Sequence, residues 1–401
     1  MTGLLLLTRG AAAAPPEDWR EREQLTGDWG GLRTRLEERG IEPWAEYTTG
    51  FWSNLDGGFD TGVRYEGFAR WGFDADLGPL SGSSIWADTS FHIDWISYHG
   101  GQPSVDLVGA FQIDSVSGWE AEEFVRFYEM YLEQELFDGA LLIDVGQLVA
   151  DNDFFVAHTA SNFLNASFGN FVSVGPVYPV AAPGVYARIR PGDGWVVRAG
   201  AYTADPGDDE SSNFGFDWKI SSDGGVALYG EVAMQRRPLG LPGTYTVGAI
   251  GDTSEFLDFE SGGTADGVYQ LHAMIDQALV LDANGQPRLA GFVRAAFAPQ
   301  DDRVRTRYHV DGGLVLFGPL PGRERDVLGV ACSFLDFAND YVRSQRAAGQ
   351  RVSRHETVLE LTYRAQVTGW LTVQPDLQVL LDPHFSRSDA VVLGFDAVIT
   401  F

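Results

Sequence analysis

The stretch FVRFYEMYLEQELFDGALLIDVG, residues 124–146, decides the fold. It contains two extended runs joined at Phe137-Asp138-Gly139, and the Asp-Gly pair is typical of a tight β-hairpin turn. From Gln147 to Gly184 the chain then shows no sustained period of either kind. Strict alternation resumes over Val185–Tyr202 around a Pro-Gly-Asp-Gly turn. We therefore expect a long loop, residues 147–184, carried between β-hairpins.

This loop is expected to be folded. A long connection without secondary structure usually signals either function or disorder. Disordered segments are poor in aromatic residues, whereas this loop is rich in phenylalanine: Phe154, Phe155, Phe163, Phe168 and Phe171. We predict that these rings anchor the loop to the inner wall of a wide barrel.

Composition excludes several classes of protein. The net charge of -28 and pI near 4.4 argue against nucleic-acid binding, which needs a basic surface. No run of eighteen apolar residues is present, which excludes a transmembrane helix, but a mean hydropathy of -0.11 is compatible with alternating barrel strands. Cys332 is the single cysteine, and no Cys/His spacing suits a metal. We therefore predict no metal and no cofactor.

From Ile41 onward the hydrophobic period is two. In residues 356–367, for example, Leu359 and Leu361 alternate with Glu360 and Thr362. The runs reach nine or more residues, the length of a tilted membrane-spanning strand rather than of an average globular one. Charges at strand centres suit a water-filled lumen. Roughly 360 residues, at about 20–24 per strand with its turn, give 15–18 strands, and bacterial barrels prefer even numbers. We predict an all-β, 16-stranded antiparallel transmembrane barrel over residues 41–401 with an aqueous channel.

The two ends of the chain support export to the outer membrane. Residues 1–14, MTGLLLLTRGAAAA, are similar to the end of a secretory signal. We expect residues 15–40 to form an N-terminal periplasmic segment, with a short helix whose apolar stripe is Leu32 and Leu36. The last run, Ala390–Phe401, alternates and ends on an aromatic residue. This ending resembles the signal that the barrel assembly machinery reads, so we expect that machinery and outer-membrane lipid as partners.

Five stretches, in order along the chain, resemble the carbohydrate-selective porin family of OprB type. They are Leu25–Arg33, Arg126–Gln134 with Val145–Gln147, Asn162–Gly169, Gly175–Gly184, and His355–Tyr363 leading to Gln374–Gln378. The resemblance implies a 16-stranded outer-membrane porin that forms homotrimers and passes glucose-like sugars. Some family members pass ions instead, so a general or ion-selective porin on the same barrel is the alternative.

Candidate pore residues follow from the alternation and from the needs of a sugar channel. Neutral sugars need hydrogen-bonding side chains around a constriction and binding weak enough for release. Arginines facing carboxylates would favour hydroxyl groups, which both donate and accept. The candidate constriction residues are Arg70, Asp74, Asp94, Arg126, Glu129, Glu133, Arg188 and Arg190. Alternatively, each of these charges only lines a wet wall and balances its neighbours.

The alternation also assigns faces to the strand that begins the deciding stretch. Glu129 and Glu133 share the lumen face with Phe127 and Tyr131, whereas Tyr128, Met130 and Leu132 face lipid. Arg126 falls on the lipid-facing side and must therefore lie at the rim or beside a bulge.

An enzyme is not expected. Paired carboxylates suit glycoside hydrolysis, but here they recur along many strands rather than in one pocket. The chain has no Gly-x-Ser-x-Gly, no His-Glu-x-x-His and no phosphate-binding loop. We predict a passive channel without catalytic residues.

Overall fold

The computed structural model describes residues 18–169, 175–205, 224–386 and 388–401. The predicted signal, residues 1–14, lies outside the described residues. The strands are β1 (Ile41–Gly57), β2 (Gly62–Asp76), β3 (Thr89–Gly100), β4 (Phe124–Leu136), β5 (Leu141–Leu148), β6 (Ala182–Gly192), β7 (Trp195–Thr203), β8 (Val226–Arg236), β9 (Gly243–Leu257), β10 (Thr264–Leu281), β11 (Pro287–Phe297), β12 (Thr306–Phe317), β13 (Val327–Phe337), β14 (His355–Gln366), β15 (Leu371–Leu381) and β16 (Ala390–Thr400).

Helical pieces are short. The α-helices are α1 (Leu32–Glu37), α2 (Leu77–Ser81), α3 (Ala166–Gly169) and α4 (Asn339–Ala347). Single turns of other helix types are η1 (Ser84–Trp86), η2 (Ser104–Val108), η3 (Gln112–Asp114), η4 (Ala150–Asn152), η5 (Ala160–Asn162) and η7 (Pro238–Gly240). Among the described residues, no helix is long and apolar enough to cross a membrane.

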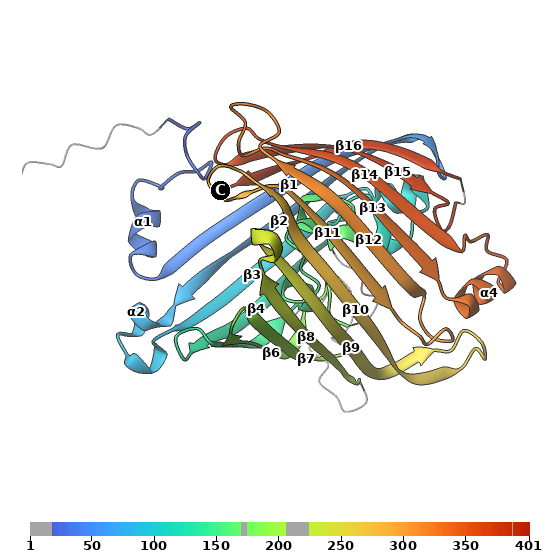
Figure 1. The fold of residues 1–401 in the computed structure, drawn as a ribbon, viewed down its shortest axis with the longest axis horizontal. Helices are drawn as coiled ribbons and strands as arrows, with labels where there is room; N and C mark the ends of the chain where they lie inside the picture. Colours follow the sequence, from blue (N-terminus) through green and yellow to red (C-terminus); the bar gives the residue numbers. More distant parts are fainter. Residues whose placement is uncertain (1–17, 170–174, 206–223, 387) are drawn as a thin grey trace, which may run out of the picture.

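The sixteen strands close into one antiparallel barrel, which confirms the predicted fold and strand number (Figure 1). Each strand pairs with its sequence neighbours, and β1 pairs with β16 from Glu46↔Thr400 onward, so none of the sixteen described strands has an unpaired edge. Along β14, Glu360 and Thr362 are buried, whereas Leu359 and Leu361 are exposed outward. The polar face of this strand therefore points inward and its apolar face meets the lipid, as predicted.

The two ends of the barrel differ. The end that carries the C-terminus holds α1, α2 and mostly short turns, and α4 and the longest connections lie at the opposite end (Figure 1). The predicted β4–β5 turn is confirmed: Phe137, Asp138 and Gly139 all have left-handed backbone, with φ of 57, 55 and 77°.

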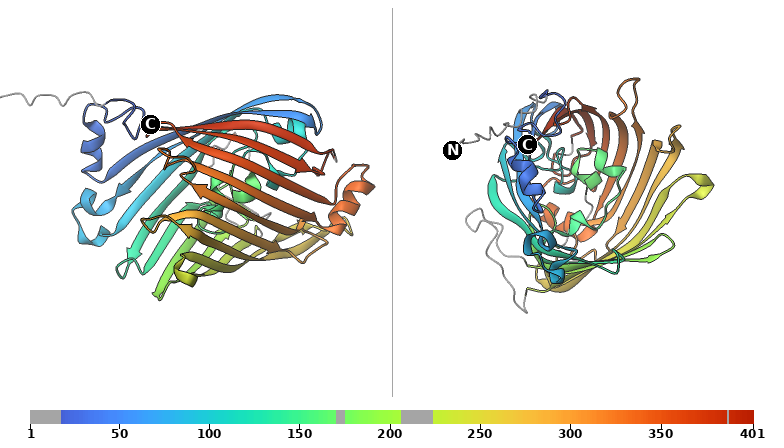
Figure 2. Two further views of the ribbon diagram at one scale, coloured as in Figure 1. Left: turned by 45° about the horizontal axis from the view of Figure 1, so that its top comes forward. Right: turned by 90° about the vertical axis from the view of Figure 1, so that its left-hand side faces the viewer.

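Two connections fold into the barrel, as the end-on view shows (Figure 2, right). The first is the predicted loop between β5 and β6; its described parts, residues 149–169 and 175–181, are called the constriction loop below. The second, residues 101–123 between β3 and β4, was not predicted, and we call it the second inward loop. Its Leu107, Val108 and Val116 pack on Trp52 and on wall residues of β14–β16.

The phenylalanine residues of the constriction loop are anchors, as expected. Phe154 and Phe155 pack among Tyr186, Tyr202 and Tyr229 of the wall. Phe163 and Phe168 pack on Phe292 and its neighbours on β11–β13. Phe171 lies outside the described residues.

The N-terminal helix is present, but its expected packing face is wrong. Leu32 is 45% exposed, whereas Arg33 is buried. The Arg33 guanidinium lies over the Trp29 ring and donates a hydrogen bond of 2.9 Å to the Phe401 carbonyl oxygen. A charge contact to the chain end, rather than an apolar stripe, thus positions α1.

Candidate functional site

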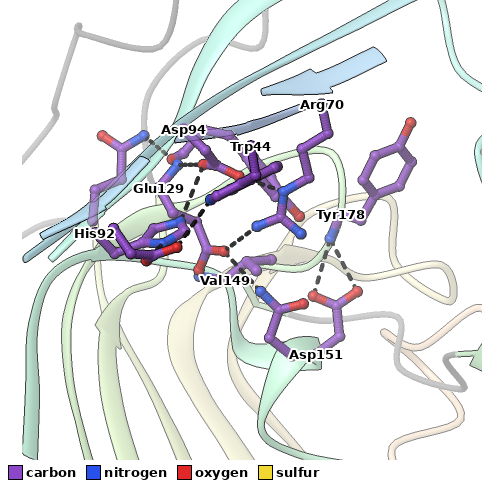
Figure 3. Close-up of polar contacts among 12 residues, drawn as sticks. Trp44, Arg70, His92, Asp94, Glu129, Val149, Asp151 and Tyr178 are labelled. Carbon is purple, nitrogen blue, oxygen red and sulfur yellow. Dashed lines mark hydrogen bonds and ion pairs between the residues drawn. The ribbon is translucent and has the colours of Figure 1, made fainter. Parts of the chain in front are cut away.

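Three of the predicted residues form one buried network inside the barrel (Figure 3). The Arg70 guanidinium on β2 pairs with Asp94 on β3, and its Nη2 lies 2.9 Å from Oε2 of Glu129 on β4. Asp94 and Glu129 are almost fully buried. The guanidinium also lies over the rings of Trp44 and Tyr128, at 5.6 and 5.3 Å. One cation thus balances two buried carboxylates, which a buried pair requires.

A β-bulge builds this network and corrects the predicted faces of β4. Ile93 pairs with Met130 and Trp95 with Phe127, so Tyr128 and Glu129 together oppose Asp94. The Glu129 amide donates to Asp94 Oδ1 at 2.8 Å. The extra residue moves each residue that precedes it in β4 to the opposite face of the sheet. A prediction that assumes uninterrupted alternation cannot detect this shift.

Three residues of β4 change sides as a result. Tyr128, predicted to face lipid, packs inside against Tyr178 of the constriction loop. Phe127, predicted to face the lumen, is instead paired with Trp95 on the outward side. Arg126 faces inward beside the bulge and donates to the Pro179 carbonyl oxygen at 3.2 Å. The loop therefore covers Arg126.

Asp74 belongs to a second group next to this network. One of its carboxylate oxygens lies 2.7 Å from His92 Nδ1, and the other accepts from Trp44 Nε1 at 2.9 Å. The His92 ring stacks on Tyr131 with centroids 4.8 Å apart. Asp74 thus orients aromatic side chains at the lumen face.

His92, Asp94 and Glu129 also approach one another closely enough to share an ion, since their ligand atoms lie within 4.8 Å. Arg70, however, already pairs with both carboxylates. A metal ion there would meet a fixed charge of its own sign, so the arrangement does not suit a metal.

Glu129 connects the wall to the constriction loop. Its Oε1 accepts from the Val149 amide at 3.0 Å, and its Oε2 accepts from Asn152 Nδ2 at 2.7 Å. Other wall carboxylates bind loop amides in the same way. The pairs are Glu231 with Phe155 at 2.8 Å, Asp276 with Thr159 at 2.9 Å, and Glu360 with Leu164 and Asn165 at 2.7 and 3.0 Å. These lumen charges are therefore hydrogen-bond acceptors for the loop backbone rather than a freely hydrated lining.

Arg294 and Glu356 complete the anchoring, and sequence reasoning missed both. Arg294 Nη2 donates to the Ser167 carbonyl oxygen at 2.7 Å and its Nε pairs with Asp311 at 2.9 Å. Glu356 accepts from the Phe111 amide of the second inward loop at 3.1 Å. The two loops are joined directly, because the Ala166 amide donates to the Ser115 carbonyl oxygen at 2.9 Å. Alternation marked these wall residues as inward, but nothing in the sequence indicated which loop group each would meet.

A cavity of about 340 Å³ lies between the constriction loop and strands β6–β10. Asn152, Asp153 and His158 line it from the loop, and Arg188, Arg190 and Arg198 line it from the wall. Arg188 and Arg190 were predicted as lumen residues, whereas Arg198 was not singled out. Glu133, the remaining candidate, is half-buried and pairs in register with Asp144 on β5.

The cavity has a cationic wall. Among the described residues, no carboxylate lies within ion-pair distance of Arg188 or Arg190, whereas Arg198 Nη1 lies 3.2 Å from Glu231 Oε2. Burial raises the pKa of the Asp153 carboxyl to about 6, although a hydrogen bond from Tyr186 and the charges of Arg198 and Arg188 oppose this rise. Guanidinium donors of the wall thus face the Asp153 carboxylate of the constriction loop across the cavity.

A closed 16-stranded barrel with charged, inward-folded loops and an open cavity beside them defines a porin. The chain belongs to the carbohydrate-selective porin, OprB family, whose model matches residues 60–401. It is similar to Porin B of Pseudomonas aeruginosa, with 28% identity over 418 residues, 93% of this chain and 88% of that protein. It is also similar to the putative porin QuiX of Acinetobacter baylyi, at 23% identity over 93% of this chain and 87% of that protein.

A solved structure agrees with the barrel. The high-pH structure of Pseudomonas putida OprB has a TM-score of 0.86 and 25% identity, and the match covers 96% of this chain and 100% of that one. The protein is therefore a carbohydrate-selective channel of the bacterial outer membrane, and porins of this family are channel proteins rather than enzymes. Because such barrels have short periplasmic turns and longer extracellular loops, we expect the end that carries residues 18–40 and the C-terminus to face the periplasm.

Proposed function

We propose that this porin passes monosaccharides such as glucose by passive diffusion through the cavity between the constriction loop and the Arg188 wall. The observation that carries the proposal is the pairing of unlike groups across that cavity. Arg188 and Arg190 offer guanidinium donors on one side, and Asn152 and Asp153 offer acceptors on the other. A sugar hydroxyl can accept from the first and donate to the second.

The passage needs no cofactor and no energy input. A sugar would replace part of its hydration shell with hydrogen bonds to the cavity wall and would leave down its gradient. The wall is open to water, so each hydrogen bond exchanges for one to solvent and contributes only about 0.5–1.5 kcal/mol. This suits a channel, where binding must be weak enough for release.

The buried network supports the opening rather than contacting the solute. Glu129 accepts hydrogen bonds from the Asn152 side chain and from the Val149 amide, the first amide of the constriction loop. Arg70 and Asp94 fix Glu129 in turn. We propose that Arg70, Asp94 and Glu129 set the position of Asn152 and Asp153, and hence the width of the constriction.

An ion-selective porin is the second candidate, and one observation favours it. Arg188 and Arg190 have no carboxylate partner among the described residues, and arginine-lined pores select anions. Saturable block by a sugar separates the two functions.

Single-channel conductance in a planar bilayer tests the proposal. Glucose is titrated against sucrose as a control solute. We expect glucose to reduce the current saturably, Arg188→Gln to weaken this block, and Arg39→Gln at the periplasmic end to leave it unchanged. Current that no sugar alters would leave the ion-selective porin as the function.

We also propose a homotrimer and recognition of Phe401 by the barrel assembly machinery. The final strand ends beside β1, and the Phe401 amide donates to the Ala45 carbonyl oxygen at 2.9 Å. Chemical cross-linking in outer membranes should give a trimer band, and removal of Phe401 should lower the amount of inserted protein. A monomer band alone, or normal insertion without Phe401, would contradict the respective proposal.

A further inference from the structure

A quarter of the basic residues of this acidic protein lie at one place. The net charge is -28, with only 28 lysine and arginine residues. Seven of these lie in residues 298–307 and 338–354, which contain only three acidic residues. They are Arg303, Arg305, Arg307, Arg343, Arg346, Arg351 and Arg354, called the arginine cluster below.

The two segments form one surface at the extracellular end. They connect β11 with β12 and β13 with β14, which are neighbours around the barrel. The Ala338 amide donates to the Arg305 carbonyl oxygen at 2.9 Å, and the Asn339 amide donates to Asp301 Oδ1 at 3.0 Å. The helix α4, which carries Arg343 and Arg346, lies at the end of the barrel opposite the C-terminus (Figure 1).

Aromatic side chains place this surface at the level of lipid headgroups. On the outer wall, the rings of Phe297 and Tyr308 stack with centroids 4.8 Å apart, and His355 stacks on Phe334 at 5.3 Å. Tyr308 and Phe334 are exposed outward. Aromatic residues of this kind mark the membrane–water interface of barrels. The Arg307 guanidinium lies over Tyr308 at 5.1 Å from the ring centroid, so the cluster begins where headgroups begin.

Much of the cluster is available for an external anion. Arg303, Arg343 and Arg354 pair with Asp302, Asp340 and Asp336. Among the described residues, Arg305, Arg307, Arg346 and Arg351 have no carboxylate within ion-pair distance. Arg305, Arg346 and Arg351 are exposed.

We propose that the arginine cluster binds the phosphate groups of the phosphorylated glycolipid that forms the outer leaflet of the outer membrane. Guanidinium groups recognise phosphate with two parallel hydrogen bonds. Basic residues at a membrane surface are attracted to anionic lipid, and the attraction is additive over the cluster. This inference rests on the outer-membrane location and is independent of the solute that the channel passes.

Lipid binding to the folded barrel in neutral detergent, followed by native mass spectrometry, tests it. The titrants are bisphosphorylated lipid A, dephosphorylated lipid A, phosphatidylglycerol and inorganic phosphate. The cluster variant carries Arg305→Gln, Arg307→Gln and Arg351→Gln. The matched control, Arg39→Gln, Arg237→Gln and Arg325→Gln, removes the same charge from exposed periplasmic positions. Heat-modifiable gel mobility checks folding, and Arg351→Gln alone repeats the test if the triple variant does not fold.

We expect bisphosphorylated lipid A to bind the cluster variant at least about tenfold more weakly than the wild type, with the control variant unchanged. Dephosphorylated lipid A should bind weakly to all three proteins. Unchanged binding in the cluster variant, or an equal loss in both variants, would overturn the proposal. Equally tight binding of phosphatidylglycerol would overturn the preference for the glycolipid, and equally tight binding of inorganic phosphate would overturn a lipid site.

Discussion

The substitution Glu129→Gln tests whether wall carboxylates hold the constriction loop. The two carboxylate oxygens of Glu129 bind different groups. Oε1 accepts a hydrogen bond from the Val149 amide at 3.0 Å, whereas Oε2 accepts from Asn152 and Arg70 at 2.7 and 2.9 Å. Glutamine has the same size but only one oxygen. If that oxygen keeps Asn152 and Arg70, the new NH₂ group points at the Val149 amide, and one buried donor loses its acceptor.

The magnitude follows from this count. An unsatisfied buried polar group costs about 1–3 kcal/mol. Since 1.4 kcal/mol corresponds to a factor of ten, the population with a released loop start should rise by about 5- to 150-fold. Truncation by Glu129→Ala leaves three donors without acceptors and should have a larger effect, because removing one partner of a buried ion pair costs about 3–5 kcal/mol.

Single-channel recording is the assay, because a released loop start widens the constriction. We expect Glu129→Gln to raise the open-channel conductance and its noise. Glu133→Gln is the matched control, since it removes one negative charge from the same strand, and Glu133 makes no hydrogen bond to the described parts of the constriction loop. Equal changes in the two variants would mean that lumen charge, not loop anchoring, sets the conductance, and would refute the reasoning.

Three further expectations concern the cavity and the loop. Replacing Arg188 and Arg190 together with glutamine should shift the reversal potential in a salt gradient toward cation preference, because the cavity loses two positive charges that no described carboxylate pairs with; an unchanged potential would exclude them from the ion path. Burial raises the pKa of Asp153 to about 6, so the carboxylate loses its charge as the pH falls from 7.5 to 5 and anion preference should increase; Asp153→Asn should abolish this shift. Phe155→Ala should lower the free energy of unfolding by about 3–5 kcal/mol, since the ring is fully buried. Heat-modifiable gel mobility follows the unfolding of the barrel, and Phe137→Ala, at an exposed position, is the control.

The barrel could be predicted from the sequence because its signal is periodic. Alternation such as Leu359–Glu360–Leu361–Thr362 gives the length and face of each strand, and a membrane barrel must place one face in lipid. The β4 bulge shows the limit of this logic. Tyr128 and Glu129 both oppose Asp94. The extra residue reverses the predicted face of every earlier residue of β4, and the sequence pattern does not indicate where it lies.

The site was only partly predictable for a different reason. The alternation along β4 predicts that Glu129 faces the lumen. Its partners Val149 and Asn152, however, come from a loop whose sequence has no hydrophobic period. The second inward loop was missed because residues 101–123 carry no aromatic run like that of the constriction loop. Arg198 shares the alternation of its strand with many neighbours, and only the folded loop shows that it lines the cavity.

The measurement that tests the central claim most directly is cysteine accessibility in a single open channel. Cys332 is the single cysteine and is exposed, so Cys332→Ser gives a background without thiols. On this background, Arg188→Cys should react with a charged methanethiosulfonate reagent, lose current, and react more slowly when glucose is present. Arg126→Cys lies under the constriction loop and should react slowly with or without glucose. Rapid modification of Arg188→Cys that leaves the current unchanged, or that glucose does not slow, would contradict a sugar path through this cavity.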